Sequence, residues 1–410
     1  MKMDLAIRPA QRAREGRSLR PVTLGLALLI LYALLWPGVT GDMRLFLLPW
    51  LDHILEHGMV GAFSIPFSNY TPPYLYLMAL VSPLAAVVSK ISLVKSLSIA
   101  GTLVLAAAVR QLLRSTGRKF SVETLLCLML LPSVAINAVG FGQCDAIWSA
   151  ACVMAVASAV CRRPLAMLIW FGVAASFKAQ AIFLGPFVVL QLLRERVPLR
   201  LWPIPGLVYG VAMVPAALAG WPVDQLATVY FHQAEWNPAF VSTATNPWSL
   251  VEYWSSAQAH HWFWLGYAAA AVAGIGYALG FRRRGKGDAA DMILLALLSA
   301  CILPFLLPKM HERFFFLADV LAFVLAVVRR DWRSMLILAF VQCASMLAIG
   351  GVMLKAPLYP VIGTPMMLAA MLLMIDELWR ATHARAPCPW EPARGTASPF
   401  TSERARIRAF

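Results

Sequence analysis

Residues 72–89 read PPYLYLMALVSPLAAVVS, and this stretch decides how the rest of the chain crosses a membrane. The run is apolar, but its three prolines disfavour a straight spanning helix, because proline removes a backbone donor and bends the helix. If the run crossed the membrane, later basic clusters such as Arg162-Arg163 and Arg329-Arg330 would lie outside. If it is an interfacial or re-entrant helix, those clusters lie in the cytoplasm, where basic loops are enriched. We therefore predict that residues 72–89 do not cross.

The composition is that of a membrane protein. Of the 410 residues, 60% are hydrophobic and only 13% are charged. A soluble domain cannot bury so much apolar surface. The net charge of +15 comes from short basic clusters between apolar runs, which is typical of cytoplasmic loops and excludes nucleic acid as a partner. The seven cysteines show no CxxC spacing, so neither a disulfide framework nor a zinc site is expected.

Apolar runs of sufficient length predict an all-α polytopic integral membrane protein with about 12 transmembrane helices. The predicted spans are 21–39, 96–113, 120–139, 146–161, 165–179, 181–193, 201–220, 261–281, 289–307, 314–328, 334–354 and 360–379. No small-residue cleavage site follows the first run, which therefore predicts an uncleaved helix rather than a signal peptide.

Three regions follow from this division. Residues 1–20 form a basic cytoplasmic N-terminus, and residues 21–380 form the transmembrane domain, with outer loops at 40–95 and 221–260. Residues 381–410 are polar and rich in proline and arginine, which predicts a disordered cytoplasmic tail. Both ends of the chain are then cytoplasmic.

In this topology only seven of the 35 lysines and arginines lie outside. Each is an exception to a strong bias and needs a physical reason to be there. The seven are Arg44, Lys90, Lys95, Lys178, Lys309, Arg313 and Lys355.

Four polar segments meet the outer face of the predicted bundle. They contain Asp42, residues 140–145, residues 178–180 and residues 311–313. Lysine and arginine present several donors to phosphate oxygens, and a nearby carboxylate suits a general base for a hydroxyl. This combination at a membrane surface indicates chemistry on a lipid-linked phosphate.

The carboxylates and the lysine also have simpler interpretations. Asp42 can be a solvated loop residue, and Asp145 can cap the helix that begins at Ala146. Asp52 lies four residues before Glu56 and can belong to an exposed helix face. Lys178 can extend its ammonium to the membrane interface.

Other residues have similar alternatives. A structural ion pair between Glu312 and Arg313 competes with a site role. Asp319 stands in an apolar run, where an ionisable group is costly and often functional, although pairing with a basic neighbour is equally compatible. The tryptophans and tyrosines of 221–264 fit an interfacial belt, with a sugar-binding platform as the alternative.

No metal motif is convincing. His53 and His57 have i, i+4 spacing, but no third ligand accompanies them. Asp42 with Asp52 or Asp145 could supply oxygen ligands to Mg²⁺ or Mn²⁺, yet nothing in the sequence requires a metal or another cofactor. Without a P-loop or GxGxxG motif, direct use of a nucleotide is not supported.

In their order along the chain, five motifs resemble the GT-C superfamily of polyprenyl-phosphate-sugar-dependent glycosyltransferases, and in particular bacterial relatives of GPI mannosyltransferase II. The motifs are Gly41-Asp42 with Trp50, Tyr70-Thr71-Pro72-Pro73-Tyr74-Leu75-Tyr76, Phe141-Gly142-Gln143-Cys144-Asp145, Phe177-Lys178-Ala179-Gln180 and His311-Glu312-Arg313-Phe314. The likeness covers roughly residues 20–330. It departs from the family pattern at Thr71, Phe141, Ala179 and Phe314.

The resemblance implies a GT-C-like fold and a mechanism. A hexose, with mannose as the sugar by analogy, arrives on a polyprenyl phosphate, and a lipid or glycan is the acceptor. Asp42 acts as the general base in a single inverting step. Lys178 and Arg313, assisted by His311, stabilise the departing phosphate.

The remaining candidates orient the substrates. Asp145 and Gln143 would position the acceptor or Asp42. The others are Gln180, Glu312, Tyr70, Tyr74 and Asp52.

The main rival is a transporter or flippase of a lipid-linked saccharide, for which repeats and buried charges are expected; no clear repeat is found. A second rival is a non-catalytic relative that acts as an assembly partner, although Asp42 is retained. The composition favours a bacterial inner membrane with the site facing the periplasm. The endoplasmic reticulum is the alternative, with its one sequon at Asn69-Tyr70-Thr71 weakened by Pro72.

Overall fold

The computed structural model describes residues 7–235, 240–283 and 287–383. Within these ranges the secondary structure is helical, apart from one isolated bridge between Ser242 and Met310. The α-helices are α1 (Ile7–Leu35), α2 (Leu48–His57), α3 (Pro72–Val81), α4 (Lys90–Ser115), α5 (Val122–Leu130), α6 (Pro132–Ala135), α7 (Asp145–Val160), α8 (Pro164–Phe177), α9 (Gly185–Arg194), α10 (Ile204–Ala219), α11 (Val223–Glu235), α12 (Pro247–Ala259), α13 (Phe263–Arg282), α14 (Ala289–Leu306), α15 (Phe316–Arg329), α16 (Trp332–Met353) and α17 (Leu358–His383). The short helices are η1 (Met43–Leu47), η2 (Gly61–Ser64), η3 (Ser82–Ala86), η4 (Ile136–Phe141), η5 (Ala179–Leu184), η6 (Leu199–Leu201) and η7 (His260–Trp262).

The helical class and the membrane character of the chain agree with the sequence. In the described part of the chain, six helices are long and apolar enough to cross a membrane: 90–115, 199–219, 257–282, 289–306, 332–353 and 358–381. A seventh candidate is the pair 122–130 and 132–141, which is bent by 71°. The helices at 20–35, 145–160, 164–177 and 179–194 are apolar but shorter. Twelve crossings therefore stay a prediction.

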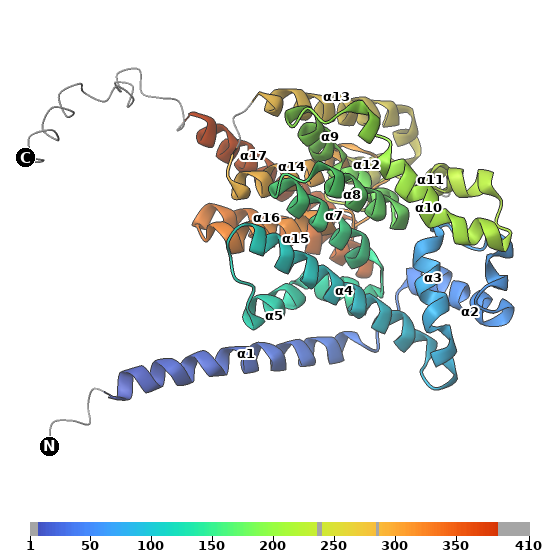
Figure 1. The fold of residues 1–410 in the computed structure, drawn as a ribbon, viewed down its shortest axis with the longest axis horizontal. Helices are drawn as coiled ribbons and strands as arrows, with labels where there is room; N and C mark the ends of the chain where they lie inside the picture. Colours follow the sequence, from blue (N-terminus) through green and yellow to red (C-terminus); the bar gives the residue numbers. More distant parts are fainter. Residues whose placement is uncertain (1–6, 236–239, 284–286, 384–410) are drawn as a thin grey trace, which may run out of the picture.

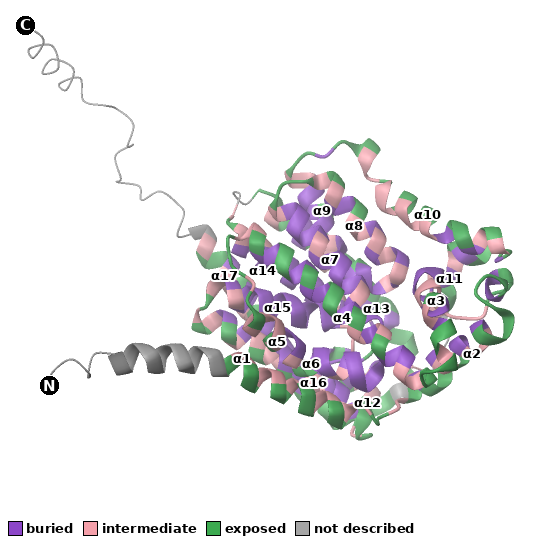
Figure 2. Cartoon of the chain, turned by 60° about the horizontal axis from the view of Figure 1, so that its bottom comes forward, coloured by how far each residue is buried: buried purple, intermediate pink, exposed green. Residues whose placement is uncertain are grey.

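The core lies along three helices, and an apolar surface surrounds it. Most residues of α7, α14 and α15 are buried (Figure 2). Large hydrophobic side chains are exposed on outer helices instead, among them Leu218 of α10 and Val272 of α13. Such an outer surface is unfavourable in water and suits contact with lipid.

The two ends of the predicted outer loop 40–95 lie close together. Lys95, near the start of α4, is fully buried and donates to carbonyls of the turn that follows α1, with Nζ 2.6 Å from the oxygen of Gly38 and 2.5 Å from that of Trp36. It also lies 3.4 Å from the carbonyl oxygen of Leu35, the last residue of α1, where carbonyls lack a partner within the helix. These contacts explain one of the seven outer cations. Between these points α2 and α3 pack together beside α10 (Figure 1).

The run 72–89 is a broken helix. α3 ends at Val81, and the tighter helix η3 follows from Ser82 to Ala86. Together they are shorter than the roughly 20 residues that a spanning helix needs. The shape and the return of the chain to α1 support an interfacial or re-entrant helix, and this position stays a prediction.

The segments predicted to be cytoplasmic also contact one another. Arg118 donates from Nη2 to the carbonyl of Val328 at 2.6 Å. Arg329 pairs with Glu377 at 2.7 Å and with Asp291 at 3.1 Å. These contacts bring Arg118 and the start of α14 together with the ends of α15 and α17, and the side of the membrane on which they lie stays a prediction. The predicted tail, 381–410, lies outside the described residues from 384 onward.

Candidate active site

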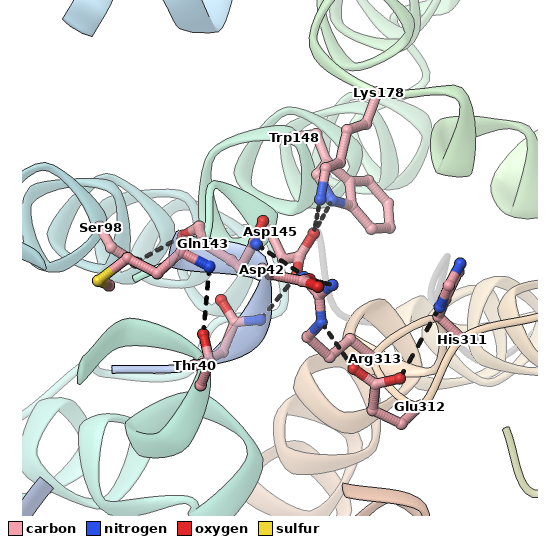
Figure 3. Close-up of polar contacts among 12 residues, drawn as sticks. Thr40, Asp42, Ser98, Gln143, Asp145, Trp148, Lys178, His311, Glu312 and Arg313 are labelled. Carbon is pink, nitrogen blue, oxygen red and sulfur yellow. Dashed lines mark hydrogen bonds and ion pairs between the residues drawn. The ribbon is translucent and has the colours of Figure 1, made fainter. Parts of the chain in front are cut away.

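Three segments far apart in sequence meet around the carboxylate of Asp145, and Arg313 connects them to Asp42 in a fourth (Figure 3). The Oδ1 of Asp145 accepts from Lys178 Nζ at 2.6 Å and from Trp148 Nε1 at 3.1 Å. Its Oδ2 accepts from Asn137 Nδ2 at 2.7 Å and from Arg313 Nη1 at 3.4 Å. This buried carboxylate is therefore fully hydrogen-bonded and paired with two cations, which offsets its loss of water.

Arg313 joins three carboxylates. Its Nη2 pairs with Asp42 Oδ2, its Nη1 contacts Asp145, and its Nε lies 3.1 Å from Glu312 Oε1. The guanidinium also stands over the ring of Phe141, 5.0 Å from the ring centre. The planar fork of arginine suits such a junction, since each N–H has a fixed direction.

Asp42 is the carboxylate of this cluster that reaches the surface. Its side chain is 37% exposed, against 5% for Asp145 and 6% for Glu312. Gln143 donates to it from Nε2 at 3.4 Å, and Tyr70 in turn donates to Gln143 Oε1 at 3.0 Å. A reacting molecule can approach Asp42, whereas the carboxylates behind it are enclosed.

Two π-helices position Asp42 and its hydrogen-bond partner Gln143. The π-helix η1 begins directly after Asp42, and the π-helix η4 ends just before Gln143. Such helices are rare and frequently occur at functional sites. Gly142 ends η4 with φ +63°, and a Cβ there would lie 2.6 Å from Met43 Cε. Glycine is required because it adopts this φ without strain and leaves room for Met43.

Lys178 is fixed in the turn between α8 and η5. Its backbone is extended and ends α8, so the side chain points toward Asp145 instead of continuing the helix. The ammonium also lies 4.8 Å from the centre of the Tyr70 ring. Since only 4% of the side chain is exposed, Lys178 forms a buried ion pair rather than extending to the membrane interface.

The segment 241–246 holds Glu312 and its neighbours. Backbone N–H groups of Thr243 and Ala244 donate to the carbonyl of Met310 at 2.9 and 3.1 Å. Thr243 Oγ1 donates to Glu312 Oε2 at 3.0 Å. His311 lies at the edge of the cluster, stacked on Phe240 with ring centres 4.6 Å apart.

The surroundings shift the pKa values of several groups in the cluster. Burial alone lowers the pKa of Lys178, but the Asp145 carboxylate outweighs it and holds the pKa well above its usual value. Burial raises the pKa of Glu312, whereas Arg313 and His311 reverse this and leave it below its ordinary value. Burial raises the pKa of Tyr70 to about 12. Partial burial lowers the pKa of His311, which favours the neutral imidazole.

An anion that binds at this cluster has to compete with the carboxylates of the cluster for its two cations. Asp42, Asp145 and Glu312 against Lys178 and Arg313 leave one formal negative charge. Arginine carries five N–H donors and lysine three, and the three contacts of Arg313 do not use them all. A phosphate can therefore bind if it displaces the most exposed carboxylate, Asp42, from Arg313.

The cluster joins most of the residues singled out from sequence. Asp42, Tyr70, Gln143, Asp145, Lys178, Glu312 and Arg313 are connected by hydrogen bonds or direct ring contacts, with His311 beside them. Asp145 makes no helix-capping bond, since it is the first residue of α7 and its side chain faces Lys178.

Three other predicted residues are not joined to this network by hydrogen bonds. Asp52 pairs with Lys90 on the surface. In the described part of the chain, the hydroxyl of Tyr74 and the Oε1 of Gln180 are buried without a hydrogen-bond partner. Their predicted contacts with substrate stay predictions.

Sequence reasoning missed Asn137, Trp148 and Thr243. An asparagine inside an apolar run, eight residues before Asp145, was a usable signal for the first. Thr243 had no signal, because its contact with Glu312 depends on tertiary packing. Asp319, the acid inside an apolar run, receives a hydrogen bond from Ser345 at 3.0 Å and lies apart from the cluster. No group of three or more metal-ligating side chains is found among the described residues.

In a comparison with known families, residues 51–194 match the family model described as "Alpha-(1->6)-mannopyranosyltransferase, N-terminal domain". The matched part contains Tyr70, Gln143, Asp145 and Lys178 but neither Asp42 nor Arg313. No curated protein matches the chain significantly. The family match supports a glycosyltransferase with a sugar donor and an acceptor as its substrates.

Proposed function

We propose that this protein is an integral membrane mannosyltransferase of GT-C type. It transfers mannose from a polyprenyl phosphate to a glycan or lipid acceptor, with inversion at the anomeric carbon. The site faces the periplasmic side of a bacterial inner membrane. One observation carries the proposal: a half-exposed carboxylate, Asp42, stands in front of two enclosed cations, Lys178 and Arg313, that are contributed by separate segments.

The donor phosphate binds where Arg313 now meets Asp42. A phosphate oxygen takes over the Nη2 donor of Arg313, which is possible because Asp42 is the least buried of its partners. Asp145 and Glu312 keep the guanidinium in position during this exchange. The polyprenyl chain of the donor then lies along the apolar outer surface, in the lipid.

The same exchange releases Asp42 for catalysis. Its carboxylate accepts the proton of the acceptor hydroxyl while that oxygen bonds to the anomeric carbon. The bond from this carbon to the phosphate oxygen breaks, and the electron pair leaves with polyprenyl phosphate. Arg313 and Lys178 stabilise the charge on the leaving oxygen.

The test uses purified protein in detergent with polyprenyl-phosphate mannose and an α-1,6-linked mannotetraose. The unaltered protein is expected to extend the acceptor. Asp42→Asn keeps the shape of the side chain but removes the base, so turnover should fall by about 10²–10⁴-fold. Its affinity for the donor should be unchanged or higher, because the neutral amide no longer competes for Arg313.

The control is Glu56→Gln, which removes an exposed carboxylate of the same outer segment. It should retain the activity of the unaltered protein. Retained turnover in Asp42→Asn would overturn the assignment of the base. Movement of the lipid-linked sugar across vesicles without transfer would instead indicate the transporter.

A further inference from the structure

A cavity lined mainly by polar residues lies between the first outer segment and α11, separate from the acid–base cluster. Its volume is about 460 Å³, which is within the range of small-molecule sites. From the first segment Ser68 and Asn69 line it, and Trp221 lines it just before α11. None of the residues of the cluster belongs to its wall.

One face of α11 forms the rest of the wall. The lining residues of this helix are Asp224, Gln225, Thr228, Val229, His232 and Gln233. Their spacing follows the turn of an α-helix, so a single stripe faces the cavity. Five of the six are polar, and Asp224 and Gln225 are exposed. The stripe can therefore form hydrogen bonds with a polar molecule.

Two of the residues that line the cavity each carry a buried polar atom that has no hydrogen-bond partner in the described part of the chain. These atoms are the Oδ1 of Asn69 and the indole Nε1 of Trp221. The Trp221 side chain is only 2% exposed. A buried donor or acceptor left unpaired is costly, so a ligand that both donates and accepts would be stabilised by pairing with these two groups.

The chemistry of the wall identifies the class of ligand. Among the described residues that line the cavity there is no lysine or arginine, so a phosphate lacks its usual partners. Amides, hydroxyls, one carboxylate, an imidazole and an indole N–H remain. This set suits a neutral molecule with many hydroxyl groups, each of which donates and accepts, as in a saccharide.

Tyr70, which follows Asn69 in the chain, connects the cavity wall to the reacting residues. Tyr70 donates to Gln143, and Gln143 donates to Asp42. Thr71 donates to the carbonyl of Phe177 at 3.1 Å, directly before Lys178. The residue that follows Asn69 therefore belongs to the chain of hydrogen bonds that ends at Asp42.

We infer that this cavity binds the inner sugar residues of an oligosaccharide acceptor, while the terminal sugar reacts at Asp42. The inference rests on the proposed function, and it makes the cavity a determinant of acceptor length. A monosaccharide acceptor reaches Asp42 without occupying the cavity. A longer acceptor gains additional hydrogen bonds there.

The experiment compares KM for methyl α-mannoside with KM for α-1,6-linked mannotetraose. The variants are Trp221→Phe, which removes the indole N–H but keeps an aromatic ring, and Gln225→Ala on the exposed stripe. Each should raise KM for the tetrasaccharide about tenfold, since one or two hydrogen bonds are lost. KM for the monosaccharide and for the donor should not change.

Gln258→Ala is the matched control, because Gln258 is exposed on α12 and does not line the cavity. An unchanged tetrasaccharide KM in both variants, or a parallel rise for the monosaccharide, overturns the inference while the proposed function stands. If Trp221→Phe fails to fold, Gln225→Ala alone decides. If the unaltered protein transfers no mannose, equilibrium binding of the tetrasaccharide decides, and equal affinity in the variants overturns the inference.

Discussion

At the scale of single residues, the pair between Lys178 and Asp145 determines whether the buried cluster is stable. The two groups are 2.6 Å apart and almost fully enclosed. Lys178→Met leaves the Asp145 carboxylate with one cation fewer, which should destabilise the fold by about 3 kcal/mol. The double variant Lys178→Met, Asp145→Asn also removes the carboxylate charge. Part of the lost stability should therefore be regained. Thermal unfolding in detergent measures both, and strictly additive losses would contradict this account.

Glu312 makes the same cluster sensitive to acid. Because Arg313 and His311 hold its pKa below the ordinary value of 4.5 despite burial, the folded state keeps the ionised form more strongly than the unfolded state does. The resulting stabilisation is complete above pH 4.5 and is lost as the pH falls below it. Glu312→Gln should therefore be less stable than the unaltered protein at pH 7, and the difference should shrink below pH 4.5. A difference in melting temperature that stays constant from pH 7 to 4 would refute this.

At the scale of elements, η4 and Gly142 control the distance between Asp42 and the cluster. Gly142→Ala forces a left-handed conformation on a residue with a Cβ, at a cost of about 1–2 kcal/mol. The new Cβ also displaces the end of Met43, which directly follows Asp42. Both the melting temperature and kcat should fall, and Met43→Ala in the same chain should recover part of kcat. Gly206→Ala on α10, where a Cβ meets no atom within 4 Å, serves as the control for a glycine replacement.

The elements also indicate what the sequence can and cannot predict. Apolar runs predict helices well, since burial in lipid or in a core selects them. The bend between α5 and α6 was not foreseen, although Pro132 stands directly at the break and begins α6. The four polar segments were found because ionisable groups are rare in this chain. Their neutral partners, such as Trp148 and Thr243, were not found, because a hydrogen bond between distant segments depends on packing that no local pattern describes.

At the scale of the whole molecule, two separate groups of polar contacts lie in different parts of the helix bundle. One end of the bundle holds Asp42, Asp145, Lys178 and Arg313, together with the polar cavity beside α11. Another set of contacts joins Arg118, the end of α15 and α17. This separation is what a membrane enzyme needs if its donor lies in the lipid and its acceptor approaches from one side.

Cysteine labelling tests the sidedness that this arrangement implies. In a background without native cysteines, Arg114→Cys at the exposed end of α4 should resist a membrane-impermeant thiol reagent applied to intact cells that express the protein, and should react after the membrane is permeabilised. Gln258→Cys, exposed on α12, should react in intact cells. If residues 72–89 crossed the membrane, the two results would be reversed, because one additional crossing inverts every later loop. Reaction of Arg114→Cys in intact cells would therefore refute both the non-crossing helix and the outward-facing site.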